Sequence, residues 1–583
     1  MPHRPSARQA FERIIGSGGI SRRQFVHRLV GSGVMLGLSG GVLTAERSQP
    51  VNKNQQLTGR KFDLVIEQMP VNITGRPAMA IAINGSIPAP TLHWQEGEEV
   101  VVRVLNRLSE PTSLHWHGIL LPYQMDGVPG ISFSGITPGA TFTYRFRVQQ
   151  SGTYWYHAHS GFQEMSGLYG AIVIAPRSNG EIPTERDYVV QLSEWTDEDP
   201  MALFRKLKSK GHYYNFNQPT LPEFLADVRS LGFGGARERR EMWNTMRMKP
   251  TDLGDLSASA LTFLMNGLTS ADNYTAPFRA GERVRLRFIN AAGNTFFDLR
   301  IPGVPMTVVQ ADGINVEPVE VDEFRIAPGE TYDVIVEPHS GTHAIFAESM
   351  ERSGFVCGSL TSEPGARADI PATRPAEWLS ITDMMGAMAM GDAAAGHSAH
   401  VANEDLAENN PLVRHASSEF GASTDMRVDM PRTNLDDPGI GLRNNGRRVL
   451  TLADLRSAAA IPDVREPARE IELHLTGNME RYSWSIDGLE YGKSTPVHFR
   501  HGERLRVTLH NDTMMTHPMH LHGMWSDLED ARGNLLARRH TLVVQPAQRL
   551  SFRVTADALG RWAWHCHLLF HMDAGMFREV VVA

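Results

Sequence analysis

Ten of the chain's 24 histidines fall in four short clusters, and their imidazole side chains could act as metal ligands. The clusters are His115-Trp116-His117-Gly118, His157-Ala158-His159, His517-Pro518-Met519-His520-Leu521-His522, and His565-Cys566-His567 with His571 following. Alternate residues of a β-strand point to the same side, so each His-x-His pair can present two imidazoles to one site. One such pair would more often be a surface or core doublet. Four pairs predict a chelating metal site.

The last cluster is the most specific of the four. A cysteine, Cys566, stands between two histidines, and His571 and Met576 follow it closely. Two imidazoles, one thiolate and a weak axial thioether form the ligand set of an electron-transfer copper. The sequence therefore predicts such a copper, held by His517, Cys566, His571 and Met576.

A repeated pair of strand-like elements must position these clusters. The first element occurs at 97–106, 281–290 and 502–511, where a Gly-Glu turn precedes alternating apolar and polar residues. The second occurs at 138–144 and 328–334, with a looser copy at 546–552. Such alternation is typical of strands with one buried face. Repetition in this order predicts three β-sandwiches of similar build, with Greek-key connections.

The expected fold is therefore all-β, with three sandwich domains and helical and loop insertions. We place the domains at 60–176, 186–362 and 464–583, so the histidine clusters belong to the first and third. Charged, helix-favouring residues near 200–258 predict added helices in the middle domain. The stretch 363–463 is rich in Ala, Gly, Met and Asp, and it predicts a flexible linker containing Met and His.

Composition and the N-terminus narrow the class of protein. A formal charge of -8 over 583 residues gives no basic face for nucleic acid. Two cysteines exclude a disulfide framework. The sequence Ser21-Arg22-Arg23-Gln24-Phe25, followed by an apolar stretch that is too short for a membrane span, resembles a twin-arginine export signal. We expect residues 1–45 to be removed, which would leave a mature periplasmic protein without a membrane span.

In order and spacing, the four motifs resemble those of the multicopper oxidases, which include laccases and ascorbate oxidase. The resemblance implies cupredoxin-like domains and four copper ions: one type 1, one type 2 and two type 3. It assigns the type 2 copper to His115 and His520. It assigns the type 3 coppers to His117, His157 and His567, and to His159, His522 and His565.

The implied ligands come equally from the first and third domains, so the trinuclear cluster should lie at their interface, with the middle domain as a structural spacer. Because Cys566 lies between His565 and His567, an electron collected at the type 1 copper can leave through the backbone. In the family an acid behind the first motif assists proton delivery, and Asp126 occupies that place, although an Asp-Gly turn alone would explain it. Met572 departs from the glutamate of several relatives, which leaves Asp573 as a possible second acid.

Segments in all three domains resemble the copper-resistance protein A branch of this family; they are 117–130, 194–200 and 522–527. The branch implies a periplasmic enzyme that oxidises Cu(I) to Cu(II) while reducing dioxygen to water, in the service of copper tolerance. Cu(I) and dioxygen would be its substrates, periplasmic copper-handling proteins possible partners, and a monomer the expected state. Copper sequestration and laccase-like phenol oxidation stay open as alternatives.

A short methionine string in the linker is the last candidate site. Thioethers are soft, uncharged ligands that suit Cu(I), so Met384, Met385, Met388 and Met390 could capture cuprous ions. A low-complexity linker that merely uses methionine is the alternative.

Overall fold

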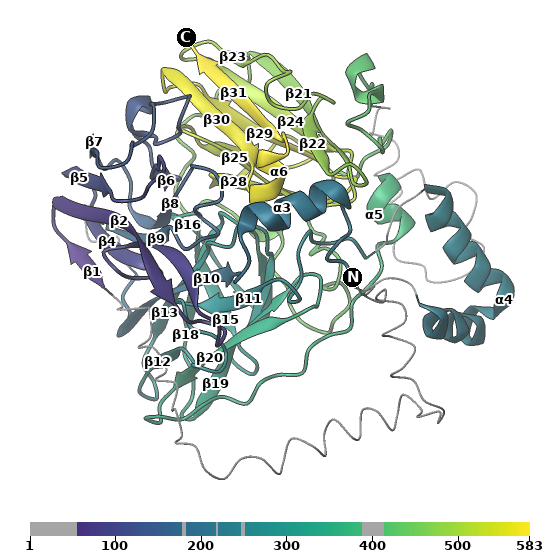
Figure 1. Ribbon diagram of the computed structural model, residues 1–583, viewed down its shortest axis with the longest axis horizontal. Helices are drawn as coiled ribbons and strands as arrows, with labels where there is room; N and C mark the ends of the chain where they lie inside the picture. Colours follow the sequence, from purple (N-terminus) through teal and green to yellow (C-terminus); the bar gives the residue numbers. More distant parts are fainter. Residues whose placement is uncertain (1–54, 178–181, 217–219, 247–250, 387–412) are drawn as a thin grey trace, which may run out of the picture. The chain divides into compact units, whose positions relative to one another are not determined.

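The computed structural model describes residues 55–177, 182–216, 220–246, 251–386 and 413–583. The predicted export signal lies outside these residues. Within them, the strands form six sheets, two in each of three successive parts of the chain, coloured purple to blue, teal, and green to yellow in Figure 1. The predicted all-β class with three sandwich domains is confirmed. None of the described helices is both long and apolar enough to cross a membrane.

The first domain contains a five-stranded sheet in the order β1-β4-β9-β8-β6 and a four-stranded sheet in the order β3-β2-β5-β7. Its strands are β1 (Gln56–Thr58), β2 (Lys61–Val71), β3 (Ala78–Ile83), β4 (Ala89–Gln95), β5 (Glu99–Asn106), β6 (His115–His117), β7 (Thr141–Arg147), β8 (Gly152–His157) and β9 (Tyr169–Ala175). A short 3-10 helix, η1 (Tyr123–Met125), follows β6.

The second domain pairs a sheet of order β11-β10-β13-β18-β15-β16 with one of order β12-β20-β19-β14-β17. Its strands are β10 (Arg186–Trp195), β11 (Thr262–Met265), β12 (Thr275–Pro277), β13 (Val284–Asn290), β14 (Phe297–Arg300), β15 (Met306–Ala311), β16 (Ile314–Val321), β17 (Glu323–Ile326), β18 (Thr331–Val336), β19 (Thr342–Ser349) and β20 (Phe355–Thr361). The predicted helical insertion contains α3 (Pro200–Ser209) and α4 (Leu221–Met246).

The third domain repeats the strand order of the second, as β22-β21-β24-β29-β26-β27 and β23-β31-β30-β25-β28. Its strands are β21 (Arg469–Asn478), β22 (Ser483–Ile486), β23 (Val497–Phe499), β24 (Arg504–Asn511), β25 (His517–Leu521), β26 (Ser526–Glu529), β27 (Leu535–Arg539), β28 (Thr541–Val544), β29 (Arg549–Thr555), β30 (Gly560–Cys566) and β31 (Phe577–Val582). A short helix, α6 (Leu569–Asp573), follows β30.

The two repeated sequence elements are adjacent strands in every domain. β5, β13 and β24 each pair antiparallel with the second element, which forms β7, β18 and β29. In β5, Val100, Val102 and Val104 are fully buried, as the alternating pattern requires.

The asparagine that ends each first-element strand anchors the loop that follows it. The side-chain amide of Asn106 donates to the carbonyl oxygens of Glu110 and Ile136, at 2.9 and 2.7 Å. Asn511 makes the equivalent bonds to Met515 and Val544, at 2.7 and 3.0 Å. In the first and third domains these loops lead directly into the strands that carry the histidine motifs, so the repeated asparagine fixes where those strands begin.

The segment predicted as a flexible linker is packed over its described parts, 363–386 and 413–463. It contains α5 (Ile381–Met385), η4 (Ser417–Phe420) and η5 (Leu452–Asp454). Leu455 is fully buried, and Arg432 exchanges backbone hydrogen bonds with the third domain, at Ala547 and Arg549. The apolar residues that pack this segment are scattered singly, so no periodic pattern reveals them in the sequence.

Candidate metal centre

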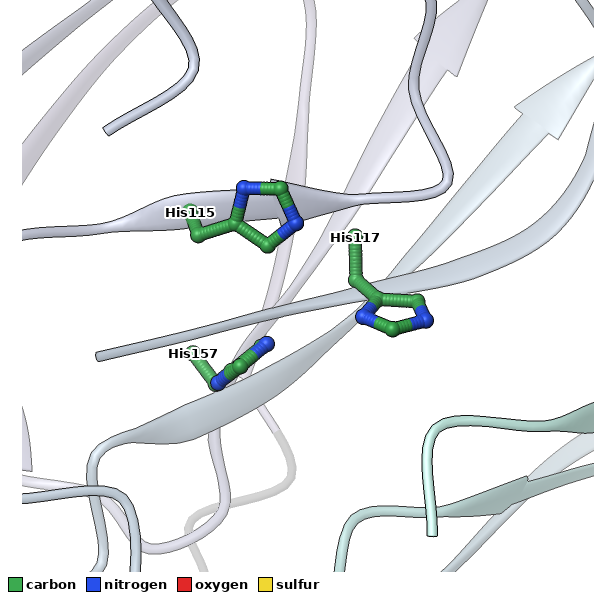
Figure 2. Close-up of side chains that lie close together, drawn as sticks. All are labelled: His115, His117 and His157. Atoms are coloured by element: carbon green, nitrogen blue, oxygen red, sulfur yellow. The ribbon is translucent and has the colours of Figure 1, made fainter. Parts of the chain in front are cut away.

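Strands of the first and third domains bring eight of the ten histidines together into one group, the histidine cluster. Its members are His115, His117, His157, His159, His520, His522, His565 and His567. In the first domain β6 pairs with β8, which places His115 opposite His157, and Figure 2 shows His115, His117 and His157 side by side. In the third domain β25 pairs with β30, which places His520 opposite His565. Rings from the two domains stack on each other, His115 on His522 at 4.0 Å and His117 on His520 at 3.8 Å.

The spacing of three ring nitrogens in the cluster fits a metal ion. The Nε2 atom of His565 lies 3.3 Å from Nε2 of His159 and 3.1 Å from Nε2 of His522. Ligand nitrogens about 2.0–2.1 Å from a tetrahedral metal ion stand roughly 3.3 Å apart. His115, His117 and His157 form another group with metal-binding spacing, and so do His115, His520 and His522.

Several ring nitrogens of the cluster are buried without a hydrogen-bond partner among the described residues. They are Nε2 of His115, His157 and His520, Nδ1 of His117, and both nitrogens of His567. A buried polar atom without a partner costs free energy, and metal coordination would satisfy it. His117 differs from the others because its Nε2 atom lies 3.2 Å from the hydroxyl of Thr541, which leaves Nδ1 for a ligand.

Hydrogen bonds hold the opposite edges of these rings. Nδ1 of His115 lies 2.8 Å from the carbonyl oxygen of Asp126, and Nδ1 of His522 lies 2.9 Å from the carboxylate of the same residue. Nδ1 of His520 contacts the carbonyl oxygen of His540 at 2.6 Å. Such bonds fix the tautomer and the orientation of a ligating ring. Asp126, predicted from its place behind the first motif, thus connects histidines of two domains.

The remaining two histidines form a second group, the cysteine site, with Cys566. Its sulfur lies 3.5 Å from Nδ1 of His517 and 3.8 Å from Nδ1 of His571, and those two nitrogens are 3.2 Å apart. A metal ion with a sulfur ligand at about 2.3 Å and nitrogen ligands at about 2.0 Å requires separations of roughly 3.3–3.8 Å. Met576 is fully buried, and its backbone bonds to Cys566 and His571, which places it beside the same site.

Three multicopper oxidase domain models match the chain, over residues 65–179, 186–357 and 465–583. The chain belongs to the multicopper oxidase family. It is 49% identical to a copper resistance protein A homolog of Pseudomonas syringae pv. tomato, over 96% of this chain and 99% of that protein. It is also 49% identical to copper resistance protein A of Escherichia coli, with the same coverage.

Solved structures of other multicopper oxidases share the fold. The structure of a laccase from Botrytis aclada matches with a TM-score of 0.62 at 20% identity, covering 91% of this chain and 88% of that one. The structure of Fet3p, described as a multicopper oxidase that functions in iron import, matches with a TM-score of 0.63 at 18% identity, covering 90% of each chain.

Burial shifts the pKa values of the buried histidines and of the cysteine in this oxidase in opposite directions. It lowers the pKa of His117, His157, His159, His517, His520, His522 and His567 well below the ordinary value, and that of His565 to about 3. These rings are neutral at physiological pH, so they can bind a metal ion without first releasing a proton. Burial raises the pKa of the Cys566 thiol, so metal binding there must release a proton.

The middle domain of the oxidase positions residues of the histidine cluster. The carboxylate of Asp312 accepts hydrogen bonds from the Arg539 side chain at 2.7 Å, and from the backbone amides of His540 and Thr541 at 3.1 Å. These bonds fix the segment whose carbonyl and hydroxyl oxygens contact His520 and His117. The predicted spacer domain therefore also orients two of the histidines.

Sequence reasoning missed several residues of the oxidase that contact the two groups. His540 lies close enough to His117 and His520 to share a metal ion, and a Cβ at Gly118 would come 2.4 Å from its ring. Asp255 contacts Nε2 of His571 at 3.0 Å. Single acids and histidines on separate elements have no spacing signature, so only the fold reveals them.

Two sequence-based candidates do not belong to either group. Asp573, considered as a second proton-relay acid, is exposed on α6. Met384 is fully buried in the hydrophobic core, which does not fit a solvent-facing capture ligand, and Met385 is partly buried against the same core. Met388 and Met390 lie outside the described residues.

Glu164 is another residue that the sequence did not indicate, and its contact with His157 supports a prediction. It is almost fully buried, and one carboxylate oxygen lies 2.5 Å from Nδ1 of His157. Glu164→Leu should lower the oxidase rate about 10–100-fold, because loss of an outer partner loosens a ligating ring. Steady-state dioxygen uptake at equal copper content would measure the loss. Glu98→Leu, at an exposed ion pair, is the control; equal rates for both variants would contradict the role of Glu164.

Proposed function

We propose that the oxidase holds four copper ions. Three would occupy the histidine cluster, and their assignment follows the family pattern: type 2 copper at His115 and His520, and type 3 coppers at His117, His157 and His567, and at His159, His522 and His565. The fourth, a type 1 copper, would bind His517, Cys566 and His571, with Met576 as axial ligand. The unpartnered inward nitrogens and the 3.1–3.8 Å spacings support this proposal.

We propose further that the enzyme oxidises Cu(I) with dioxygen and contributes to copper resistance. Four Cu(I) ions would give four electrons, which with four protons reduce one dioxygen to two waters. Bound copper would supply the one-electron redox chemistry. The names of the relatives that are 49% identical over 96% of the chain support the copper-resistance role. The twin-arginine motif at 21–25 supports export to the periplasm.

The surroundings of His571 favour a small electron donor over a bulky phenol. The His571 side chain is fully buried, with Trp484 stacked on one face at 3.8 Å. Its outer nitrogen contacts Asp255, whose carboxylate also accepts a hydrogen bond from Tyr482 at 2.7 Å. A carboxylate in this position attracts a cation such as Cu(I). A phenol could reach the ring only by displacing this acid.

Residues of this chain would also guide protons and electrons. Asp126 contacts histidines from both domains and is positioned to hold a proton beside the cluster. A cavity of ≈ 10 Å³ lined by His115, His520, His522 and His540 has room for about one water molecule. Cys566 belongs to one group and its neighbours His565 and His567 to the other, so a short covalent path joins the two groups.

Dioxygen uptake by the copper-loaded protein tests this function. A Cu(I) complex should drive rapid uptake, a phenolic dye should drive slow uptake, and copper-depleted protein should give background rates. Faster uptake with the dye would favour a laccase-like phenol oxidase. No uptake despite full copper loading would contradict the enzymatic function and leave copper sequestration.

A further inference from the structure

A second buried group of ligand-type side chains lies outside the oxidase site, in the third domain. His474 lies on β21, and Asp512 directly follows β24. His415 and Glu419 come from the segment packed onto this domain, where η4 contains Glu419. All four side chains are at most 6% exposed. We call these four residues the second cluster.

Four atoms of the second cluster form a closed ring. Nδ1 of His415 lies 2.7 Å from Oε2 of Glu419, and that oxygen lies 3.3 Å from Nδ1 of His474. Nδ1 of His474 lies 2.6 Å from Oδ2 of Asp512, which lies 3.8 Å from Nδ1 of His415. Ligand atoms around one tetrahedral metal ion stand roughly 3.3 Å apart. To reach that spacing the two shortest separations, 2.6 and 2.7 Å, would have to lengthen and the longest, 3.8 Å, would have to shorten.

The second oxygen of each carboxylate in this cluster lies outside the ring and accepts a hydrogen bond from the backbone, which orients the carboxylate. Oε1 of Glu419 accepts a hydrogen bond from the Ala416 amide at 3.1 Å, and Oδ1 of Asp512 accepts one from Val428 at 2.7 Å. Each carboxylate therefore directs one remaining oxygen into the ring. Nε2 of His415 lies 3.3 Å from the carboxylate of Asp429 but forms no hydrogen bond with any described residue.

The two buried carboxylates of the second cluster need a positive charge to balance them. Among the described residues, the ion-pair partners of Glu419 and Asp512 are only His415 and His474. Two buried carboxylates require compensation, and neutral imidazoles provide none. The ring thus attracts positive charge, and one divalent ion would balance both carboxylates.

We propose that His415, Glu419, His474 and Asp512 bind one divalent first-row transition metal ion, Cu²⁺ or Zn²⁺. Two imidazoles and two carboxylates suit either ion, and Cu²⁺ binds such donors more tightly when both ions are available. Two ligands come from the segment between the second and third domains and two from the β-sandwich. The ion would therefore fasten this segment to the domain that carries the cysteine site. The proposal does not depend on the oxidase activity.

Metal content of matched variants tests the proposal. Full-length wild type, His415→Gln, Glu419→Gln and the control His498→Gln, which changes an exposed histidine of the same domain, would be incubated with Cu²⁺ alone or Zn²⁺ alone. After gel filtration, plasma mass spectrometry would count bound ions. Wild type and His498→Gln should carry one more ion per chain than the other two variants. The arm that shows this difference identifies the ion, while the Cys566-dependent absorption stays equal.

Thermal unfolding provides the second measurement. Added metal should raise the Tm of wild type and His498→Gln by more than that of His415→Gln, because one stabilising site is lost in the variant. Equal metal content in all four proteins, with equal Tm shifts, would overturn the proposal and leave a hydrogen-bonded network of histidines and carboxylates. Since the comparison is between variants, it holds even if the oxidase proves inactive. If Glu419→Gln fails to fold, His415→Gln alone decides the outcome.

Discussion

Cys566→Ser is expected to reduce dioxygen uptake with Cu(I) to the background of copper-depleted protein. Serine removes the thiolate from a site whose sulfur stands 3.5 and 3.8 Å from two imidazole nitrogens. A hydroxyl is a hard, weakly acidic ligand and does not replace a thiolate for copper. The loss should exceed the 10–100-fold typical of outer-partner mutations. The rate of dioxygen uptake and the intensity of the thiolate-to-copper absorption band would measure the loss.

The chain contains a matched control for this variant. Cys357 is the only other cysteine, and it is buried on β20 of the middle domain, where it belongs to a small hydrophobic cluster. Cys357→Ser should keep the absorption band and nearly all of the uptake rate, at some cost in stability. Should Cys566→Ser keep a substantial rate with Cu(I), the electron path through the cysteine site would be wrong.

The sequence allowed the fold class and the histidine motifs to be predicted because both leave periodic signals. Alternating apolar residues at 97–106 and its two copies predict strands that the structure pairs as β5-β7, β13-β18 and β24-β29. A His-x-His pair on a strand places both rings on one side. The structure brings the pairs of the first and third domains together across an interface, where Nε2 of His159 lies 3.3 Å from Nε2 of His565.

The rest of the site could not be predicted because it depends on contacts between distant parts of the chain. Glu164, Asp255 and Asp312 are single acids in loops or at strand ends, and acids in such places are usually solvated turn residues. Asp312 acts through Arg539, 227 residues further along the chain. The packing of the segment around 413–463 likewise relies on isolated apolar side chains that form no pattern in sequence.

Asp126→Ala is expected to lower both copper retention and the uptake rate by about 10–100-fold. The Asp126 carboxylate lies 2.9 Å from Nδ1 of His522, so its loss frees that ring, whereas His115 loses a 3.3 Å contact but keeps its 2.8 Å bond to the backbone carbonyl oxygen of residue 126. Copper content by mass spectrometry and dioxygen uptake would measure the two effects separately.

Asp126→Asn distinguishes positioning from proton delivery. The amide oxygen of asparagine can still accept the hydrogen bond from His522, so copper content should stay close to that of wild type. An amide does not hold or release a proton at physiological pH, so the rate should still fall and its dependence on pH should change. A rate and pH profile equal to wild type would show that Asp126 only orients the two histidines. Asp573→Asn, at an exposed acid near the cysteine site, is the control and should leave both quantities unchanged, because its side chain is directed to solvent rather than to either group.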